Sequence, residues 1–270
     1  MPSYSPTEVA AQYATERHLR TRIQTHERYS VGPGLEATVD RLLALNGDEA
    51  VLDVGTGPGD FPGRLRAGGH RGRIVGLDFS AGMVARASEQ YPAVEFLQGD
   101  AAALPFPDAT FDVVTARHML YHVPDVAAAL AEFKRVLKPG GHFLAVTNAA
   151  GYMAELWEAV AEALPDESRF ADIRGSRQSF ATAFSEMSGV DQVRQTFGNA
   201  DTEFLESVLV FPEPEPVLAY LNSIPAIQQL PDLDRENALS RLRRTLTART
   251  QGGAWRVSKR VVFISARRQE

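Results

Sequence analysis

Short apolar runs alternate with helical patterns through the first half of the chain. The runs are rich in Val, Leu, Ile and Phe, and between them apolar residues recur at the spacing of an amphipathic helix. The predicted strands of this half are 51–54, 73–78, 94–97, 111–116 and 142–147. Strands that alternate with helices predict a parallel sheet with helices on both faces and right-handed crossovers.

The pattern is less regular after Asn148. Two strands are predicted here, at 203–211 and 256–266. The helical patterns are at 153–164, 178–187, 190–197, 217–223 and 235–248. We predict an α/β fold of the doubly wound, Rossmann-like type. It has a seven-stranded, mostly parallel sheet with an antiparallel last strand, plus helical lid insertions.

No repeat, low-complexity tract or long linker divides the chain, so we expect one structural domain with four parts. These are an N-terminal helical lid segment (1–40), a ligand-binding core (41–150), a helical cap or substrate region that includes one sheet strand (151–250), and the last strand (251–270). Residues 1–40 have two open interpretations, ordinary packing against the core or a lid over the ligand.

A glycine-rich turn follows the first predicted strand, in the sequence Gly55-Thr56-Gly57-Pro58-Gly59-Asp60. Glycines there let a ligand lie against bare backbone at the start of a helix. The dinucleotide fingerprint G-x-G-x-x-G would place its third glycine at Asp60, which is acidic. Asp53 and Asp60 would repel a pyrophosphate and tolerate a cation. S-adenosylmethionine, with an adenosine half and a positive sulfonium, fits this charge pattern better than NAD does.

Polar residues follow several of the predicted strands, where a parallel sheet binds its ligand. Gly55, Asp78, Asp100 and the pair Arg117-His118 all fall at such strand ends. Asp78 ends the second strand, about where a carboxylate meets a ribose's hydroxyls. The alternative is that Asp78 caps the next helix, for which Ser80 is also a candidate cap.

Composition and charge narrow the classes of function. A net charge of −6 and a pI near 5.6 argue against a general nucleic-acid binder. No apolar run is long enough to span a bilayer and no signal-peptide core is present, so we expect a cytoplasmic protein without a membrane span. The absence of cysteine excludes disulfides, thiolate metal sites and a cysteine nucleophile, and we predict no metal site.

The charge is uneven along the chain. From Arg235 to the end there are ten basic and two acidic residues. A solvated helix face and a charge-protected edge strand explain this more simply than a site for an acidic partner, which remains the alternative.

Four motifs in order resemble those of the class I S-adenosylmethionine-dependent methyltransferases, and within that fold the small-molecule branch that includes ubiquinone/menaquinone-biosynthesis methyltransferases. The resemblance covers about residues 45–148. The motifs are Val51-Leu52-Asp53-Val54-Gly55-Thr56-Gly57-Pro58-Gly59; Gly76-Leu77-Asp78-Phe79-Ser80 with Met83; Gly99-Asp100-Ala101 with Leu104-Pro105-Phe106 and Phe111-Asp112-Val113-Val114; and Arg135-Val136-Leu137-Lys138-Pro139-Gly140-Gly141.

The resemblance implies a role for each matching position. The three glycines would hold the methionine and ribose portions, Asp78 would accept from both ribose hydroxyls, Phe79 and Met83 would pack on the adenine, and Asp100, with the Ala101 N–H beside it, would accept from the adenine amino group. The candidate cofactor-binding residues are Tyr13, Arg17, Asp53, Gly55, Thr56, Gly57, Gly59, Asp78, Phe79, Met83, Asp100, Ala101 and Arg117.

The chain departs from many relatives after the fourth strand, in Arg117-His118-Met119-Leu120-Tyr121-His122. Arg117 would reach the carboxylate of the cofactor or of a substrate, and His118 is the candidate catalytic residue facing the methyl acceptor. Tyr121 and His122 are candidate substrate residues, although packing or capping is the simpler role for His122. Tyr13 and Arg17, at i and i+4, are the candidate closing contacts of a lid.

The leading hypothesis is therefore transfer of a methyl group to an O, N or C nucleophile of a small molecule by a monomer or homodimer. The alternatives are a non-catalytic S-adenosylmethionine-binding protein with a regulatory or assembly role, and an RNA or protein methyltransferase. The methyl acceptor would be set by residues 1–40 and 148–250, where the sequence shows pattern without mechanism.

Overall fold

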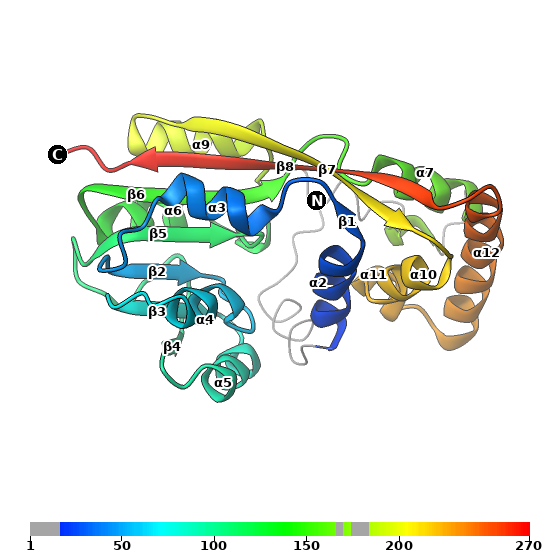
Figure 1. Ribbon diagram of the computed structural model, residues 1–270, viewed down its shortest axis with the longest axis horizontal. Coiled ribbons are helices and arrows are strands. Elements are labelled where there is room, and N and C mark those ends of the chain that lie inside the picture. The colour runs from blue at the N-terminus through cyan, green and yellow to red at the C-terminus, as the bar shows by residue number, and fades with distance from the viewer. Residues whose placement is uncertain (1–16, 166–169, 174–183) are drawn as a thin grey trace.

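One mixed sheet of eight strands crosses the molecule from end to end in the computed structural model (Figure 1). The structure describes residues 17–165, 170–173 and 184–270. The strand order is β1-β7-β8-β6-β5-β2-β3-β4. The strands are β1 (Ser30–Val31), β2 (Val51–Val54), β3 (Ile74–Asp78), β4 (Glu95–Gln98), β5 (Phe111–Arg117), β6 (Leu137–Asn148), β7 (Asp201–Phe211) and β8 (Trp255–Arg267).

Helices lie on both faces of this sheet and beyond the carboxyl ends of its parallel strands (Figure 1). The helices are α2 (Arg17–Tyr29), α3 (Leu35–Leu43), α4 (Asp60–Ala67), α5 (Ala81–Gln90), α6 (Val126–Val136), α7 (Ala154–Ala163), α9 (Ser188–Phe197), α10 (Glu215–Asn222), α11 (Pro225–Gln228) and α12 (Asp232–Thr250), with a 3-10 turn η1 (Leu120–His122).

Strands β2 to β6 form the parallel half, and their alternating side chains make two cores. Val51 and Leu144 pack with α3 and α4 on one face. Leu52 and Phe143 pack with α6 and α9 on the other. Both faces are therefore covered, and the predicted doubly wound fold is confirmed.

The antiparallel last strand is also confirmed, but the predicted strand number is one too low. β8 pairs antiparallel with β6, and β7 pairs antiparallel with β8 along its whole length. The additional strand is β1, which consists of two residues and pairs with Val208 and Leu209 of β7. So short a segment has no alternation to read in the sequence, and it becomes a strand only because β7 offers it an open edge.

The strands β7 and β8 extend past the carboxyl ends of the parallel strands and position the helices after Asn148 there. β6 ends at Asn148, which pairs with Val261, so residues 255–260 of β8 run past the carboxyl ends of the parallel strands. A separate core of α7, α10, α11 and α12 packs on this extension, around Leu209 and Phe211. Figure 1 shows these helices beyond the carboxyl ends, where the sequence predicted a cap.

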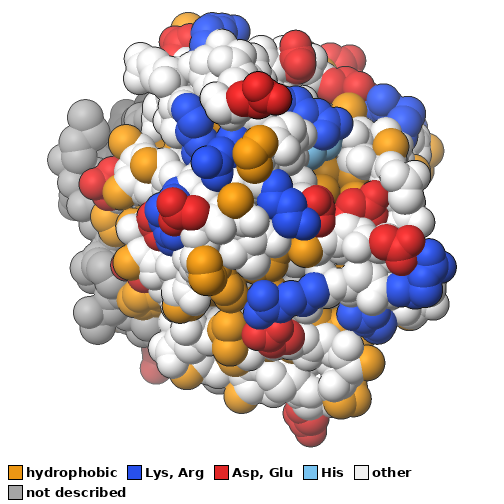
Figure 2. Space-filling view, turned by 90° about the vertical axis from the view of Figure 1, so that its left-hand side faces the viewer, with side chains coloured by type: hydrophobic (Ala, Val, Ile, Leu, Met, Phe, Trp, Pro, Cys, Tyr) orange, Lys and Arg blue, Asp and Glu red, His pale blue; other side chains and the backbone are white. Residues whose placement is uncertain are grey.

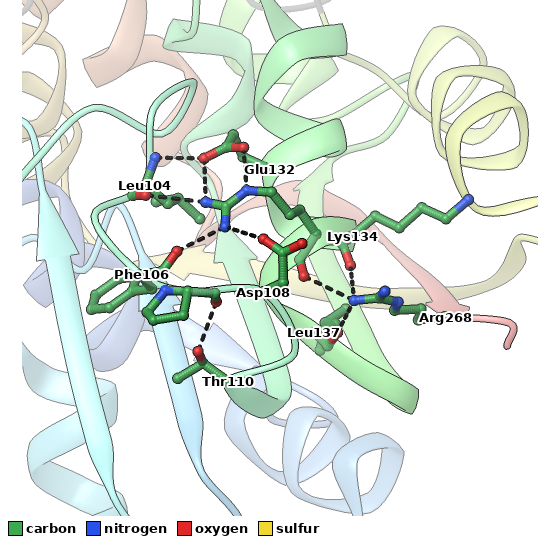
Figure 3. A network of polar contacts seen from close by, with 10 residues as sticks. Leu104, Phe106, Asp108, Thr110, Glu132, Lys134, Leu137 and Arg268 are labelled. Carbon is green, nitrogen blue, oxygen red and sulfur yellow. Dashed lines mark hydrogen bonds and ion pairs between the residues drawn. The ribbon is translucent and has the colours of Figure 1, made fainter.

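One of the motif arginines has a structural role. The Arg135 guanidinium donates to the carbonyl oxygens of Leu104 and Phe106, at 3.1 and 2.8 Å, and its Nε donates to Glu132 at 2.7 Å. Arg268 donates to the Arg135 carbonyl oxygen at 2.8 Å, at the C-terminal end of α6 (Figure 3). These hydrogen bonds of Arg135 fix the loop before β5 to α6, at the opposite end of β5 from the carboxyl ends of the parallel strands.

The end of the molecule nearest the C-terminus carries acidic and basic side chains that are interspersed (Figure 2). Such a mixed surface gives no extended field of one sign.

Candidate functional site

A cavity of about 380 Å³ lies at the carboxyl ends of β2, β3 and β5 and brings most of the predicted site residues together. The predicted residues that line it are Asp53, Gly55, Thr56, Gly57, Asp78, Phe79, Met83, Asp100, Ala101, Arg117, His118 and His122. Residues from five separate segments thus meet in one space, because parallel strands end on the same side of a sheet. We call this space the first cavity.

The glycines of the turn after β2 have different tasks. Gly57 has φ +55° and lines the cavity, and a Cβ there would meet only a Leu19 methyl at 3.7 Å. Gly59 has φ +82°, and a Cβ there would lie 2.7 Å from Phe96 and 2.9 Å from Ala87. Gly59 is not among the residues that line the cavity, and its missing side chain lets the start of α4 pack closely on Phe96 and Ala87. Its ligand role stays a prediction.

Asp78 ends β3 with its carboxylate at the cavity. One oxygen accepts from the Gly57 N–H at 2.8 Å and the other from the Ser80 N–H at 2.9 Å. Ser80 rather than Asp78 is the N-cap of α5, since its hydroxyl accepts from the Met83 N–H. Burial raises the pKa of Asp78, against the effect of these two N–H groups. The carboxylate has four lone-pair positions, so it retains acceptor capacity for a ligand's hydroxyls.

Asp53 and Arg117 form a charged pair under the glycine turn. The Arg117 Nε lies 3.8 Å from an Asp53 oxygen, and Thr115 donates to that oxygen at 2.6 Å. Burial raises the pKa of Asp53, and the Arg117 charge counteracts this. Arg117 also donates to Glu36 at 2.8 Å and lies over the Phe61 ring. These contacts hold its guanidinium at the wall of the cavity, already paired with two carboxylates.

The expected adenine end of the cavity has an apolar and a polar side. Met83 is buried, whereas Phe79 leaves 42% of its surface exposed, which is unusual for an aromatic ring and suits a ring that a ligand covers. The Asp100 carboxylate accepts from the Ala102 N–H at 2.9 Å and lines the same space. The fit of these residues to an adenosine remains a prediction.

Helix α2, which lies in the segment predicted as a possible lid, contributes two wall residues that the sequence analysis did not name. Leu19 and Ile23, one turn apart, line the cavity, and Arg20 pairs with Asp60 at 3.3 Å. Two apolar residues at i and i+4 in an otherwise polar helix were the available signal. Of the two predicted closing residues, Arg17 is exposed at the start of α2 and does not line the cavity, and Tyr13 lies outside the described residues.

A second cavity of about 530 Å³ adjoins the first, between α2, η1 and the cap. The two cavities share Leu19, Ile23, His118 and His122 in their walls. Tyr121, a predicted substrate residue, lines only the second cavity. The wall is rich in aromatic and basic side chains. Among them are Arg22, His26, Tyr121, Tyr152, Trp157 and Tyr220.

The two histidines of the shared wall are neutral at pH 7. Burial lowers the pKa of His118 to about 3, with a further decrease from the Lys259 charge, and burial lowers the pKa of His122 to about 4. His118 also has φ +53°, an uncommon conformation for a residue other than glycine. The backbone bends at the end of β5 and places this imidazole between the two cavities.

Two further findings concern the described parts of the chain. None of the helices described is both long and apolar enough to cross a membrane. Within residues 17–165, 170–173 and 184–270, no three histidine or carboxylate side chains gather as a metal site would require.

Comparison with known proteins connects the first cavity to a family. The sequence model of the family described as "Methyltransferase domain" matches residues 52–145, which hold the glycine turn, Asp78 and Asp100. The demethylmenaquinone methyltransferase of Bacillus licheniformis is 46% identical over 105 residues, which are 37% of this chain and 45% of that protein. The chain thus spans about half the length of the curated relatives it matches.

Solved structures share the fold at low sequence identity. The phosphoethanolamine N-methyltransferase 2 of Haemonchus contortus, in complex with phosphomonomethylethanolamine and S-adenosylhomocysteine, has a TM-score of 0.55 at 18% identity, covering 100% of this chain and 59% of that one. The [4+2]-cyclase SpnF has a TM-score of 0.59 at 17% identity, covering 98% and 96% of the two chains. A cyclase with this architecture means that the fold by itself does not specify the reaction.

Proposed function

We propose that this chain, which has the class I methyltransferase fold, binds S-adenosylmethionine in the first cavity and transfers its methyl group to a small molecule in the second. The observation that carries the proposal is the shared wall. Two cavities that meet at His118, His122, Leu19 and Ile23 place two ligands side by side, as a direct transfer between them requires.

The residues of the first cavity suit this ligand. Gly57 leaves open space beside the chain where a Cβ would otherwise stand, and Asp78 offers acceptor positions for a diol. Arg117 pairs with Asp53 and Arg20 pairs with Asp60. The described lining of the first cavity still has six acidic residues and one arginine, so it favours a cationic sulfonium over a pyrophosphate. When bound, S-adenosylmethionine supplies an activated methyl group, so the protein's main task is alignment.

The second cavity is then the acceptor site, and residues 151–250 supply much of its cap. Tyr152, Trp157 and Tyr220 come from this region, and His26 from α2. His118 and His122 are the polar residues placed to contact both ligands, since both of them line the two cavities. An imidazole that is neutral at pH 7 can accept a hydrogen bond from an acceptor's hydroxyl.

The test is calorimetry of the chain with S-adenosylmethionine, S-adenosylhomocysteine and NAD, followed by transfer of a labelled methyl group to a panel of small molecules. We expect both S-adenosyl compounds to bind and NAD not to. Binding of NAD alone would reject the proposal. Cofactor binding without transfer to any class of acceptor would favour the non-catalytic alternative, or a cyclisation of the kind that SpnF's name describes.

An Asp78→Asn substitution should weaken the binding of S-adenosylmethionine by ~1–3 kcal/mol, the cost of removing one partner from a charged hydrogen bond. The amide keeps the size of the carboxylate, and its oxygen can still accept from the Gly57 N–H, so the glycine turn should keep its shape. The Ser80 N–H loses its acceptor, so a thermal melt should show a small loss of stability at the start of α5. Calorimetry measures the change. Asp48→Asn, at an exposed ion pair with Arg71, is the matched control and should bind as the unmodified chain does. Equal affinity in the two variants would remove Asp78 from the site.

A further inference from the structure

The second cavity has aromatic walls and a positive electrostatic environment. Tyr121, Tyr152, Trp157 and Tyr220 supply rings, and Arg22 supplies a cation. Glu186 is the acidic residue among the described lining, and its carboxylate already accepts from the Ala150 N–H at 3.0 Å and pairs with Arg260 at 3.1 Å. No uncommitted carboxylate of the described wall therefore faces a ligand.

Two cations near this cavity lack a carboxylate partner in the described chain. Arg22 donates to the Ser223 carbonyl oxygen at 2.6 Å, and Lys259 lies 3.4 Å from the Ser30 hydroxyl. Arg22 itself lines the cavity. Lys259 does not, but its charge acts on two lining histidines, since it adds to the effect of burial in lowering the pKa of His26 and His118. A net positive field of this kind stabilises an anion and opposes a second cation.

Two neutral polar atoms of the wall are buried without a hydrogen-bond partner among the described residues. They are the Nδ1 of His26 and the Oδ1 of Asn148. The Nε2 of His26 is already engaged with the Tyr152 hydroxyl at 3.0 Å. Buried polar atoms are rarely left unpaired, so these two add polar positions to residues of a wall that is rich in aromatic side chains.

We propose that the second cavity binds a flat, hydroxylated ring system as its anion, an ionised phenol or enol, and that this oxygen is the methyl acceptor. The inference rests on the proposed function and narrows its acceptor from an O, N or C nucleophile to an anionic oxygen. Aromatic walls suit a planar ring system, since rings pack on one another by offset or edge-to-face contact. A volume of about 530 Å³ is within the range that holds drug-sized ligands.

The step balances without a further reactant. The hydroxyl proton leaves to solvent as the anion binds, and the oxygen forms a bond to the methyl carbon. The carbon–sulfur bond breaks, and its electron pair stays on sulfur. An anion and a sulfonium cation thus become a neutral methyl ether and a neutral thioether, so an apolar space favours the loss of both charges. An ammonium acceptor would instead face Arg22 and Lys259.

The test uses three compounds with the same ring system, 2-naphthol, 2-methylnaphthalene and 2-naphthylmethylamine, with the full chain in the presence and absence of S-adenosylhomocysteine. We expect 2-naphthol to bind more tightly than the other two, with its anion at least about tenfold more tightly bound than its neutral form. Its absorbance should show the naphtholate form, with a pKa at least about one unit lower than in water, which is the same factor of ten. A bound naphthol that ionises as it does in water would overturn the inference, and so would tighter binding of the ammonium compound.

Variants separate the charge from the shape of the cavity. Lys259→Met keeps the length of the side chain and should raise the pKa of bound 2-naphthol part of the way back to its value in water. The binding of 2-methylnaphthalene should not change. Arg256→Met is the control, because it is on the same strand three residues earlier and its exposed side chain leaves the opposite face of the sheet. Equal effects of the two variants on 2-naphthol would contradict the proposal.

The inference and the proposed function fail in different ways. If S-adenosylhomocysteine does not bind, the proposed function is wrong, and the ionisation of 2-naphthol measured without it still decides whether the second cavity favours an oxygen anion. If S-adenosylhomocysteine binds and the ammonium compound is preferred, the transfer reaction stands and the acceptor class proposed for it is wrong.

Discussion

A Gly57→Val variant should fold and yet bind S-adenosylmethionine about 10- to 100-fold more weakly, since placing extra methyl groups in a fitted space costs ~1–3 kcal/mol. At this position a Cβ would meet only a Leu19 methyl, at an ordinary contact distance, and would otherwise enter the first cavity. The branched side chain must also adopt φ +55°, a left-handed conformation that costs ~1–2 kcal/mol of stability. Calorimetry and a thermal melt measure the two effects separately.

Two other glycines serve as controls for this result. Gly140 also has a positive φ, +75°, and a Cβ there would have no neighbour within 4 Å. Gly140→Val should therefore lower the thermal stability through backbone strain and leave the binding of S-adenosylmethionine unchanged. Gly59→Ala should chiefly lower the thermal stability, since its Cβ would overlap the Phe96 ring. If Gly57→Val and Gly140→Val bind S-adenosylmethionine alike, the ligand does not lie against the glycine turn.

The free energy of unfolding should fall steeply between pH 6.5 and about 4.5, because four histidines are held neutral in the folded chain. Burial lowers the pKa of His26 and His118 to about 3 and that of His122 and His142 to about 4, from 6.5. Below pH 6.5 the unfolded chain binds a proton at each, whereas the folded chain does not until the pH nears the lowered values. Protons therefore favour unfolding throughout this window.

Each such histidine lowers the free energy of unfolding by up to about 1.4 kcal/mol for each unit by which the pH falls in this window. Water that reaches the rings lining a cavity reduces this contribution, so we expect a total loss on the order of 3–4 kcal/mol between pH 7 and 5. Asp53 and Asp78 act in the opposite direction, since their pKa values are raised and the folded chain takes up their protons more readily. Urea unfolding at pH 7, 6 and 5 measures the balance.

His142 provides a variant for this test that avoids both cavities. It is buried in β6, and its Nδ1 has no hydrogen-bond partner in the described chain. His142→Asn should therefore flatten the dependence of stability on pH by about the share of one histidine. A free energy of unfolding that stays constant from pH 7 to 5 would mean that the imidazoles become protonated in the folded state, and would contradict the burial of these rings.

The first cavity was predictable from the sequence to an unusual extent, for a local reason. The glycine turn, Asp78 and Asp100 each follow a strand directly, so the pattern that identifies the strand also identifies the residue at its end. Parallel strands then bring those ends together without any further information. Periodicity and the position of the strand ends therefore placed Gly55, Asp78, Asp100 and Arg117 at one end of the sheet, whereas the roles of Phe79 and Met83 came from the family resemblance.

The roles of Arg117 and Gly59 were not predictable in the same way. Arg117 is expected to meet a ligand's carboxylate and lines the first cavity, and Glu36, from a helix far earlier in the chain, also pairs with it at 2.8 Å. Gly59 belongs to the glycine motif. Only the position of the Phe96 ring, on β4, shows that a side chain at Gly59 would clash and that its absence allows close packing. Both assignments depend on a neighbour that no local pattern indicates.

The second cavity was decided by tertiary structure alone. Its walls come from α2, η1, α7 and α10, and they meet only because β7 and β8 extend past the carboxyl end of β6 and carry the cap to that edge. His26 and Tyr152, 126 residues apart, are hydrogen-bonded across it. The sequence determined the fold class and which residues stand at the carboxyl ends of the parallel strands, since these follow from periodicity within each segment. The acceptor space depends on side chains from distant segments, and only their packing brings them together.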